Sequence, residues 1–134
     1  MKYLLDTDTC ISAIKQEESV LQQMLSRRRS DIALSVVTEA ELRTGAAKST
    51  SPKKSLARLE NFLAPLQILE FTSEDAAAYA RVRARLETEG RPIEPLDTLI
   101  AAHGVSRGLI LVTSNEREFR RVQKLKVENW RTKT

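Results

Sequence analysis

Acidic residues recur in this sequence where apolar segments end, and their side chains are the groups with the most distinctive chemistry. Asp6 directly follows the apolar run 3–5, and Glu118 lies just past the apolar run 109–113. Glu41 and Asp97 lie in predicted helices among small or apolar turn-mates, where an unpaired carboxylate is costly. Carboxylates that gather without histidine or cysteine partners form hard-oxygen sites, which suit Mg²⁺ or Mn²⁺ rather than zinc.

Each of these acids also has a simpler explanation, in which it only stabilises a helix or a loop. Asp6 and Asp97 stand where an N-cap or helix-dipole partner is expected. Glu41 has the spacing from Thr38 of a capping box, and Glu118 fits a surface loop. Each explanation accounts for one residue, whereas a shared site accounts for all four. A metal-dependent hydrolysis of phosphodiesters is the chemistry that such a site would support.

The segment 114–118 leaves one ligand position open. Glu116 and Glu118 compete for a place in the site, and Asn115 is a neutral oxygen donor beside them. We favour Glu118 over Asn115 as the fourth residue of the site.

The elements that position these residues alternate along the chain. Short apolar runs predict strands at 3–5, 32–35, 67–71, 109–113 and near 127. Between them, helices are predicted at 11–15, 18–25, 36–47, 52–63, 73–90, 96–107 and 117–122. Ser35 and Ser73 are the predicted N-caps of two of these helices, and Gly108 ends another. Strands that alternate with helices predict a parallel sheet covered by helices on both faces.

Composition narrows the class of protein. The 134 residues suit a single domain spanning residues 1–134, and a hydrophobic fraction of 41% favours a globular chain. The single cysteine, Cys10, excludes an internal disulfide and fits a reducing cytoplasm. We expect no membrane span and no signal peptide, because no apolar run is long enough.

Positive charge points to a polyanionic partner. The formal net charge is +4, and the basic residues cluster at 27–29, 48–58, 81–91 and 117–126. A basic surface favours nucleic acid, although many of these side chains are expected to belong to solvated helix faces. Arg27-Arg28-Arg29 is one candidate for contact with RNA; it would otherwise face solvent or a protein partner.

Four motifs resemble one known family. The stretches Leu4-Leu5-Asp6-Thr7-Asp8-Thr9-Cys10, Glu41-Leu42-Arg43-Thr44-Gly45-Ala46, Pro95-Leu96-Asp97-Thr98-Leu99-Ile100-Ala101 and Leu111-Val112-Thr113-Ser114-Asn115 are similar to the motifs of PIN domains. Their order and spacing most resemble the VapC toxins of bacterial toxin–antitoxin pairs, particularly the group that cleaves initiator tRNA. The resemblance extends through Glu128-Asn129-Trp130.

The resemblance implies a fold, an activity and partners. The fold would be a three-layer α/β/α arrangement with a parallel five-stranded sheet. The activity would be that of a Mg²⁺-dependent endoribonuclease, with tRNA as substrate and Mn²⁺ as a possible substitute ion. A homodimer and a complex with a VapB-type antitoxin would be expected, in the cytoplasm.

The resemblance also implies roles for individual residues. Asp6 and Asp97 would be the principal metal ligands, and Glu41 the third acid. Many PIN domains carry aspartate where Asn115 stands, and Glu118 would then supply the following acid. At the edge of the site, Thr7 and Ser114 would orient ligands or contact phosphate.

Three alternative functions compete with that of a PIN-domain ribonuclease. Asp6 and Asp8 resemble the paired aspartates of haloacid-dehalogenase-type phosphatases, but the late acidic pair of that family is absent. A phosphorelay receiver needs an acceptor aspartate after the third strand, where Glu70-Phe71-Thr72 stands. A catalytically inactive RNA-binding PIN domain stays open. The lone histidine, His103, excludes a two-histidine ribonuclease mechanism and is expected on a helix surface; its pairing with Cys10 as a nucleophile is disfavoured.

Overall fold

Five short parallel strands form the centre of the molecule. The computed structural model describes residues 1–131, so the last three residues of the predicted domain lie outside it. The strands are β1 (Tyr3–Leu5), β2 (Ile32–Ser35), β3 (Gln67–Leu69), β4 (Ile110–Val112) and β5 (Lys126–Glu128). Their order across the sheet is β3-β2-β1-β4-β5, and every pairing is parallel. The predicted parallel five-stranded sheet is therefore confirmed.

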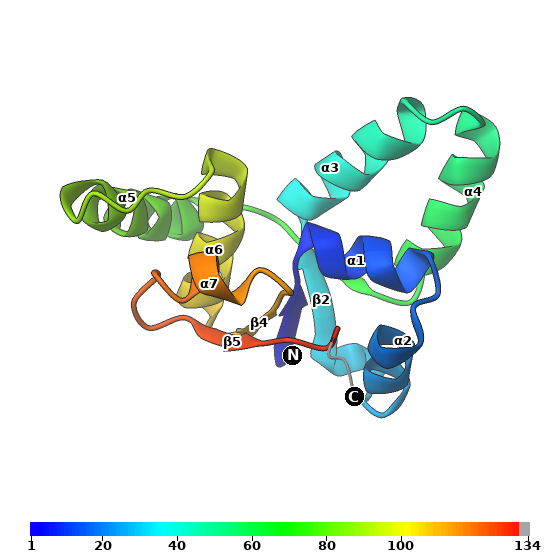
Figure 1. Cartoon of the computed structure of the whole chain (residues 1–134), viewed down its shortest axis with the longest axis horizontal. Helices are drawn as coiled ribbons and strands as arrows, with labels where there is room; N and C mark the ends of the chain where they lie inside the picture. The colour runs from blue at the N-terminus through cyan, green and yellow to red at the C-terminus, as the bar shows by residue number, and fades with distance from the viewer. Residues whose placement is uncertain (132–134) are drawn as a thin grey trace.

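Helices cover both faces of this sheet, as predicted. Those in the described part of the chain are α1 (Thr7–Ile14), α2 (Glu18–Leu25), the short 3-10 helix η1 (Arg29–Asp31), α3 (Val36–Ala47), α4 (Pro52–Leu63), α5 (Ser73–Thr88), α6 (Pro95–Arg107) and α7 (Glu116–Phe119). Figure 1 shows α1 to α4 on one side of the strands and α5 to α7 on the other. The fold is thus the expected three-layer α/β/α arrangement.

Two hydrophobic cores hold the layers together. Leu5 and Leu34 point from the strands into a core that reaches Leu59 on α4, whereas Leu4 points to the opposite core with Ile100 on α6. Successive strand residues face opposite sides, so a strand buried on both faces must be apolar throughout. All residues of β1 and β2 are buried. This explains why β1 and β2 are continuous apolar runs and do not alternate between apolar and polar residues.

Several element boundaries differ from the sequence prediction for local reasons. Helix α1 begins at Thr7 rather than at residue 11, because Asp6 accepts a hydrogen bond from Thr9 N and starts the helix early. The N-cap of α5 is Thr72 and not Ser73, and Thr72 forms a reciprocal capping box with Asp75. Because the chain turns into this cap, β3 is shorter than predicted.

Two other predicted segments also shift. Helix α7 is a single turn that starts one residue before, and ends three residues before, the predicted span 117–122. Gly108 does end α6, with φ of 65° in the left-handed region that glycine tolerates. The predicted N-cap Ser35 is confirmed, since its hydroxyl accepts from Val37 N.

His103 was expected on a helix surface, and this expectation is wrong. Its side chain is fully buried, because α6 is covered by the sheet on one side and α5 on the other. Its Nδ1 lies 2.9 Å from the Ser35 hydroxyl and its Nε2 lies 3.0 Å from the Glu70 carbonyl oxygen. Ser35 already accepts from a backbone amide, so its hydroxyl proton points to Nδ1 and the Nε2–H donates to Glu70. Burial lowers the pKa of His103, so it is a neutral structural link.

Arg27 is held within the fold and is not a free cation. Its guanidinium lies over the rings of Tyr3 and Trp130, at 4.8 and 4.6 Å from their centroids. It also lies 3.9 Å from a Glu128 carboxylate oxygen. These contacts tie the helix α2 region to the last strand, so the candidate RNA patch at 27–29 loses its first member.

No helix in residues 1–131 combines the length and the apolar character that crossing a membrane would require.

Candidate active site

The predicted acidic residues lie near the carboxyl edge of the sheet. The chain leaves β1 toward β2 and β3 on one side, and later returns to place β4 on the other side of β1. This reversal of direction creates a crevice beyond the carboxyl ends of β1 and β4, which is where open parallel sheets bind ligands. Asp6 follows β1 directly, and the segment 113–118 follows β4.

Asp6 is the most deeply buried of these acids. Its side chain is 4% exposed, and Oδ1 accepts from Thr9 N at 2.8 Å. Its own amide donates to the Val112 carbonyl oxygen at 3.0 Å, which fixes it between β1 and β4. Burial raises the pKa of Asp6, and hydrogen bonds from Thr113 and Thr9 partly oppose that rise. Asp6 is therefore both the N-cap of α1 and a carboxylate at the crevice.

Glu41 is oriented by the first turn of another helix. The Thr7 hydroxyl donates to Glu41 Oε1 at 2.6 Å, and lies 3.3 Å from the Thr38 hydroxyl. This bond joins α1 to α3 across 34 residues of sequence. The capping box of Glu41 with Thr38 is not observed, because Ser35 is the N-cap of α3 and Thr38 lies within the helix. Glu41 thus points to the crevice and not to its own helix start.

Asp97 lies in the first turn of α6, where the charges of neighbouring acids raise the pKa of its carboxyl. Its pKa is raised to about 6, first by burial and then by repulsion from Glu94, Glu41, Asp6 and Glu118. The N-cap position of α6 belongs to Glu94, so Asp97 is not a plain N-cap. Asp6 and Glu41 are therefore near enough to Asp97 to act on its carboxyl through their charges. Within the described chain, Asp97 forms no side-chain hydrogen bond that would compensate for this repulsion.

The two glutamates of α7 have different surroundings. Glu116 accepts from Arg120 at 2.8 Å and from Asn129 at 3.1 Å, and these bonds lower its pKa. The charge of Glu118 instead contributes to the raised pKa of Asp97. Glu118 therefore stays the predicted fourth residue of the site.

The two polar residues before α7 lie at the same edge. Asn115 is the N-cap of α7, and its backbone N–H donates to the Thr113 hydroxyl at 2.9 Å. Its side chain forms no cap bond, and that of Ser114 forms no hydrogen bond within residues 1–131, so both stay available to a ligand.

Thr113 also belongs to the site, although the sequence motifs did not predict it. It is fully buried, and its oxygen is occupied by the Asn115 amide, so its proton is free to donate to Asp6. Thr113 directly follows β4, and Asp6 directly follows the paired strand β1. This position at the strand end could have indicated a role for the Thr113 hydroxyl.

The donor set fits a hard divalent cation. Within residues 1–131, no three acidic, cysteine or histidine side chains lie close enough to ligate one ion together. Mg²⁺ does not require such a cage, because it keeps several water ligands and is often held by one or two carboxylates. Asp6 and Asp97 are the predicted direct ligands, and the repulsion that raises the pKa of Asp97 favours positive charge at this position.

Nucleophilic catalysis by Cys10 is excluded by its surroundings. The Cys10 side chain is fully buried, and burial together with the charge of Asp6 raises the pKa of its thiol well above the ordinary value. His103 is engaged with Ser35 and Glu70 in a different part of the core. The two residues therefore form no catalytic pair.

Known proteins resemble this chain over nearly its whole length. The family model "PIN domain" matches residues 3–125. The tRNA(fMet)-specific endonuclease VapC of Salmonella typhimurium is 38% identical over 130 residues, which cover 97% of this chain and 98% of that protein. The protein of the same name from Shigella flexneri is 39% identical with the same coverage, and Ribonuclease VapC2 of Haemophilus influenzae is 40% identical.

Solved structures agree in fold. DNA-bound VapBC from Salmonella typhimurium superposes with a TM-score of 0.93 at 38% identity, over 97% of this chain and 98% of that one. VapBC2 from Rickettsia felis, bound to a fragment of promoter DNA, gives 0.89 at 35% identity, over 97% and 99% of the two chains. Sequence and structure together establish that this chain is a member of the PIN-domain family and, within it, of the VapC ribonucleases.

Proposed function

We propose that this chain is a divalent-metal-dependent endoribonuclease, that its ion is Mg²⁺ with Mn²⁺ as a substitute, and that its substrate is tRNA. The anticodon region of initiator tRNA is the proposed target, because the Salmonella and Shigella relatives are named for tRNA(fMet). The observation that carries the proposal is the raised pKa of Asp97, which is repelled by Glu41, Asp6 and Glu118. The mutual repulsion of these acids is relieved when a bound cation compensates their charge.

Within this proposal, each residue has a distinct task. Asp6 and Asp97 hold the metal, and Glu41 and Glu118 complete the acidic crevice on either side. A bound ion would activate water and neutralise charge on the scissile phosphate. Thr7 holds the Glu41 carboxylate in place through its 2.6 Å bond.

Neutral groups at the rim complete the site. Ser114 and Asn115 offer a hydroxyl and an amide to the phosphate or to metal-bound water, with Asn115 where many PIN domains have aspartate. Thr113 and Thr9 both hydrogen-bond to the buried Asp6 carboxylate.

We further propose that the chain acts in the cytoplasm as the toxin of a toxin–antitoxin pair. The relatives of known structure are VapBC complexes, which supports a VapB-type antitoxin as partner. A homodimer is supported by an apolar surface beside the site, where Val36 and Leu96 are 37% and 39% exposed on α3 and α6. Toxin–antitoxin hetero-oligomers would then be built from such dimers.

The decisive experiment compares three substitutions in cleavage of total tRNA, with Mg²⁺ and with EDTA. Asp6→Asn and Asp97→Asn should each abolish cleavage, although asparagine still caps a helix and keeps α1 folded. Asp8→Asn is the matched control, because Asp8 lies two residues after Asp6 but is exposed on the first turn of α1.

The control also separates the rival enzyme from the proposed one. A phosphatase of the haloacid-dehalogenase type would need Asp8, so Asp8→Asn would remove its activity. Cleavage that persists in EDTA, or in both the Asp6 and Asp97 variants, would refute the nuclease proposal. An inactive RNA-binding domain would leave tRNA intact under every condition.

A further inference from the structure

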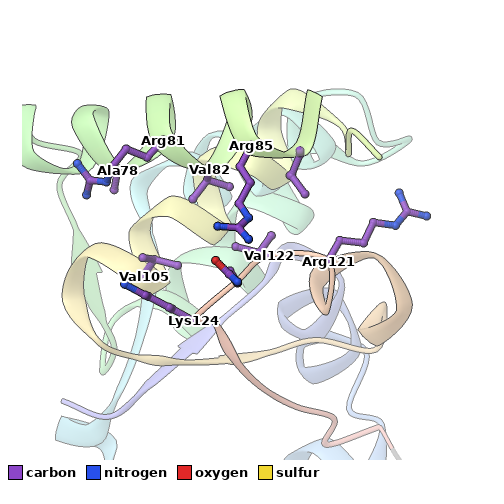
Figure 2. Close-up of a pocket in the computed structure, with 10 residues that line it drawn as sticks. Ala78, Arg81, Val82, Arg85, Val105, Arg121, Val122 and Lys124 are labelled. Carbon is purple, nitrogen blue, oxygen red and sulfur yellow. The ribbon is translucent and has the colours of Figure 1, made fainter. Parts of the chain in front are cut away.

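A basic hollow lies on the face of the molecule that carries α5, next to the acidic crevice but separate from it. It has a volume of about 260 Å³ and lies between α5, the end of α6 and the segment that joins α7 to β5 (Figure 2). Its floor is aliphatic and is formed chiefly by Val82, Val105 and Val122. Four cations surround that floor and no carboxylate lines it; they are Arg81, Arg85, Arg121 and Lys124. Figure 2 shows Arg85 pointing from α5 toward Val122.

Most of this positive charge is uncompensated. Arg85 lies 3.1 Å from Glu89 on the next turn of its helix. Within residues 1–131, Arg81 and Lys124 have no carboxylate within ion-pair distance, and neither does Arg121. Elsewhere on the surface, arginines are usually paired. Arg83, two residues from Arg81 on the same helix, lies 2.8 Å from Glu87. The hollow therefore concentrates cations that lack a partner.

Arg121 is anchored yet keeps free donors. Its Nη1 donates to the Pro92 carbonyl oxygen at 3.2 Å, which fixes the guanidinium at the rim. Its Nε is buried without a hydrogen-bond partner in the described chain. A guanidinium carries five N–H donors in a planar fork that matches the oxygens of a phosphate. A phosphate at the rim would accept from the Nη donors of this guanidinium that Pro92 does not occupy.

The walls of the hollow continue into the segments that carry the acidic residues. Arg121 N donates to the Glu118 carbonyl oxygen at 3.1 Å, so these residues share one turn. Pro92, which anchors Arg121, belongs to the loop that leads into α6 and Asp97. Through Arg121 and Pro92, the hollow is thus connected along the chain to the segments that carry Glu118 and Asp97.

We propose that this hollow is an exosite that holds one unpaired nucleotide of the RNA substrate, with its phosphate on the arginines and its base over the aliphatic floor. The proposal rests on the proposed nuclease function. The volume is slightly below the roughly 300–1,000 Å³ of sites for drug-sized ligands, which suits one nucleotide and not an extended segment. Arginine planes stack on unpaired bases, and Arg85 is placed to do so.

An acidic peptide is the alternative occupant, and the structure favours it less. A docked peptide segment normally fills several pockets or pairs with a strand edge. This hollow is a single depression whose walls are two helices and a connecting segment.

The test is a pair of charge-matched double variants of the full-length chain. Arg81→Gln with Lys124→Gln removes two unpaired cations from the rim. Arg83→Gln with Lys53→Gln removes two exposed cations elsewhere and serves as the control. Binding of tRNA is measured in EDTA over a salt series, and cleavage with Mg²⁺ is measured on tRNA and on a short RNA that spans only the cut site. The side chains of both pairs are exposed, so neither double variant should disturb folding. Thermal unfolding of each variant checks this.

The expected result is a roughly tenfold loss of tRNA affinity in the rim variant, with a shallower salt dependence, and a much smaller loss in the control. KM for tRNA should rise while kcat and cleavage of the short RNA stay unchanged. A second variant, Val82→Phe, fills the hollow without changing charge and should weaken tRNA binding in the same way.

Equal tRNA affinity in the rim and control variants would overturn the exosite. So would a rim variant that binds tRNA normally but loses affinity for an acidic peptide, because this would assign the hollow to a protein. Failure of the nuclease function looks different: wild-type chain would then cleave no RNA, and the binding measurements in EDTA would still decide whether the hollow holds RNA.

Discussion

Replacing Asp97 with asparagine should stabilise the metal-free protein while destroying its response to metal. The pKa of Asp97 is about 6 in the folded chain, against an ordinary value of 3.8. The native state therefore holds this proton more tightly than the unfolded state does. The stability that comes from the proton is fully present below about pH 3.8, and is lost as the pH rises through 6.

The size of the effect follows from the same shift. Each pKa unit corresponds to about 1.4 kcal/mol, so a shift of about two units sets an upper bound of about 3 kcal/mol. Asp97 is only half-buried, and solvent screening reduces this to about 1–2 kcal/mol. Asparagine does not titrate, so the stability advantage of the variant over wild type should grow between pH 4 and pH 6 and then level off.

Urea unfolding in EDTA across this pH range measures the difference directly. A parallel series with Mg²⁺ should reverse the order of stability, because the ion stabilises only the chain that binds it, by about 2.7 kcal/mol at one hundred times Kd. A stability difference that does not change with pH in EDTA would refute the assignment of crowded carboxylates. A variant that gains as much stability from Mg²⁺ as wild type would refute Asp97 as a ligand.

Three further substitutions test the surroundings of the site. Thr7→Val removes the hydroxyl that holds a site carboxylate at 2.6 Å, and should lower kcat for tRNA about tenfold with little change in unfolding free energy; Thr7→Ser should retain activity. Glu118→Gln should impair cleavage more than Glu116→Gln, because only the charge of the first glutamate contributes to the raised pKa of Asp97; equal activities would contradict this. Asp75→Asn should destabilise the fold by about 3 kcal/mol in urea unfolding, since it leaves the Arg107 guanidinium, now 2.9 Å from this buried carboxylate, without its partner.

Much of the fold could be predicted from local signals. Helices α3 and α4 begin and end at the predicted residues, because Ser35 caps the first and Pro52 opens the second. The two buried central strands stood out as short apolar runs. The position of Asp6 at a strand exit followed from the abrupt change from leucine to aspartate.

What the sequence could not show depends on contacts between distant segments. The bond from Thr7 to Glu41 joins residues on two helices, and no local pattern encodes it. Glu118 and Glu116 differ only in which neighbours the folded chain brings to them. The burial of His103 follows from the layer of α5 over α6, which periodicity within one helix does not reveal.

The order of the strands has a consequence for synthesis of the protein on the ribosome. β1 is made first, yet its second partner, β4, begins only at residue 110, and Glu118 comes later still. A nascent chain that lacks these residues has an open edge at the centre of its sheet and an incomplete acidic crevice. The acidic crevice is therefore complete only when nearly the whole chain has left the ribosome.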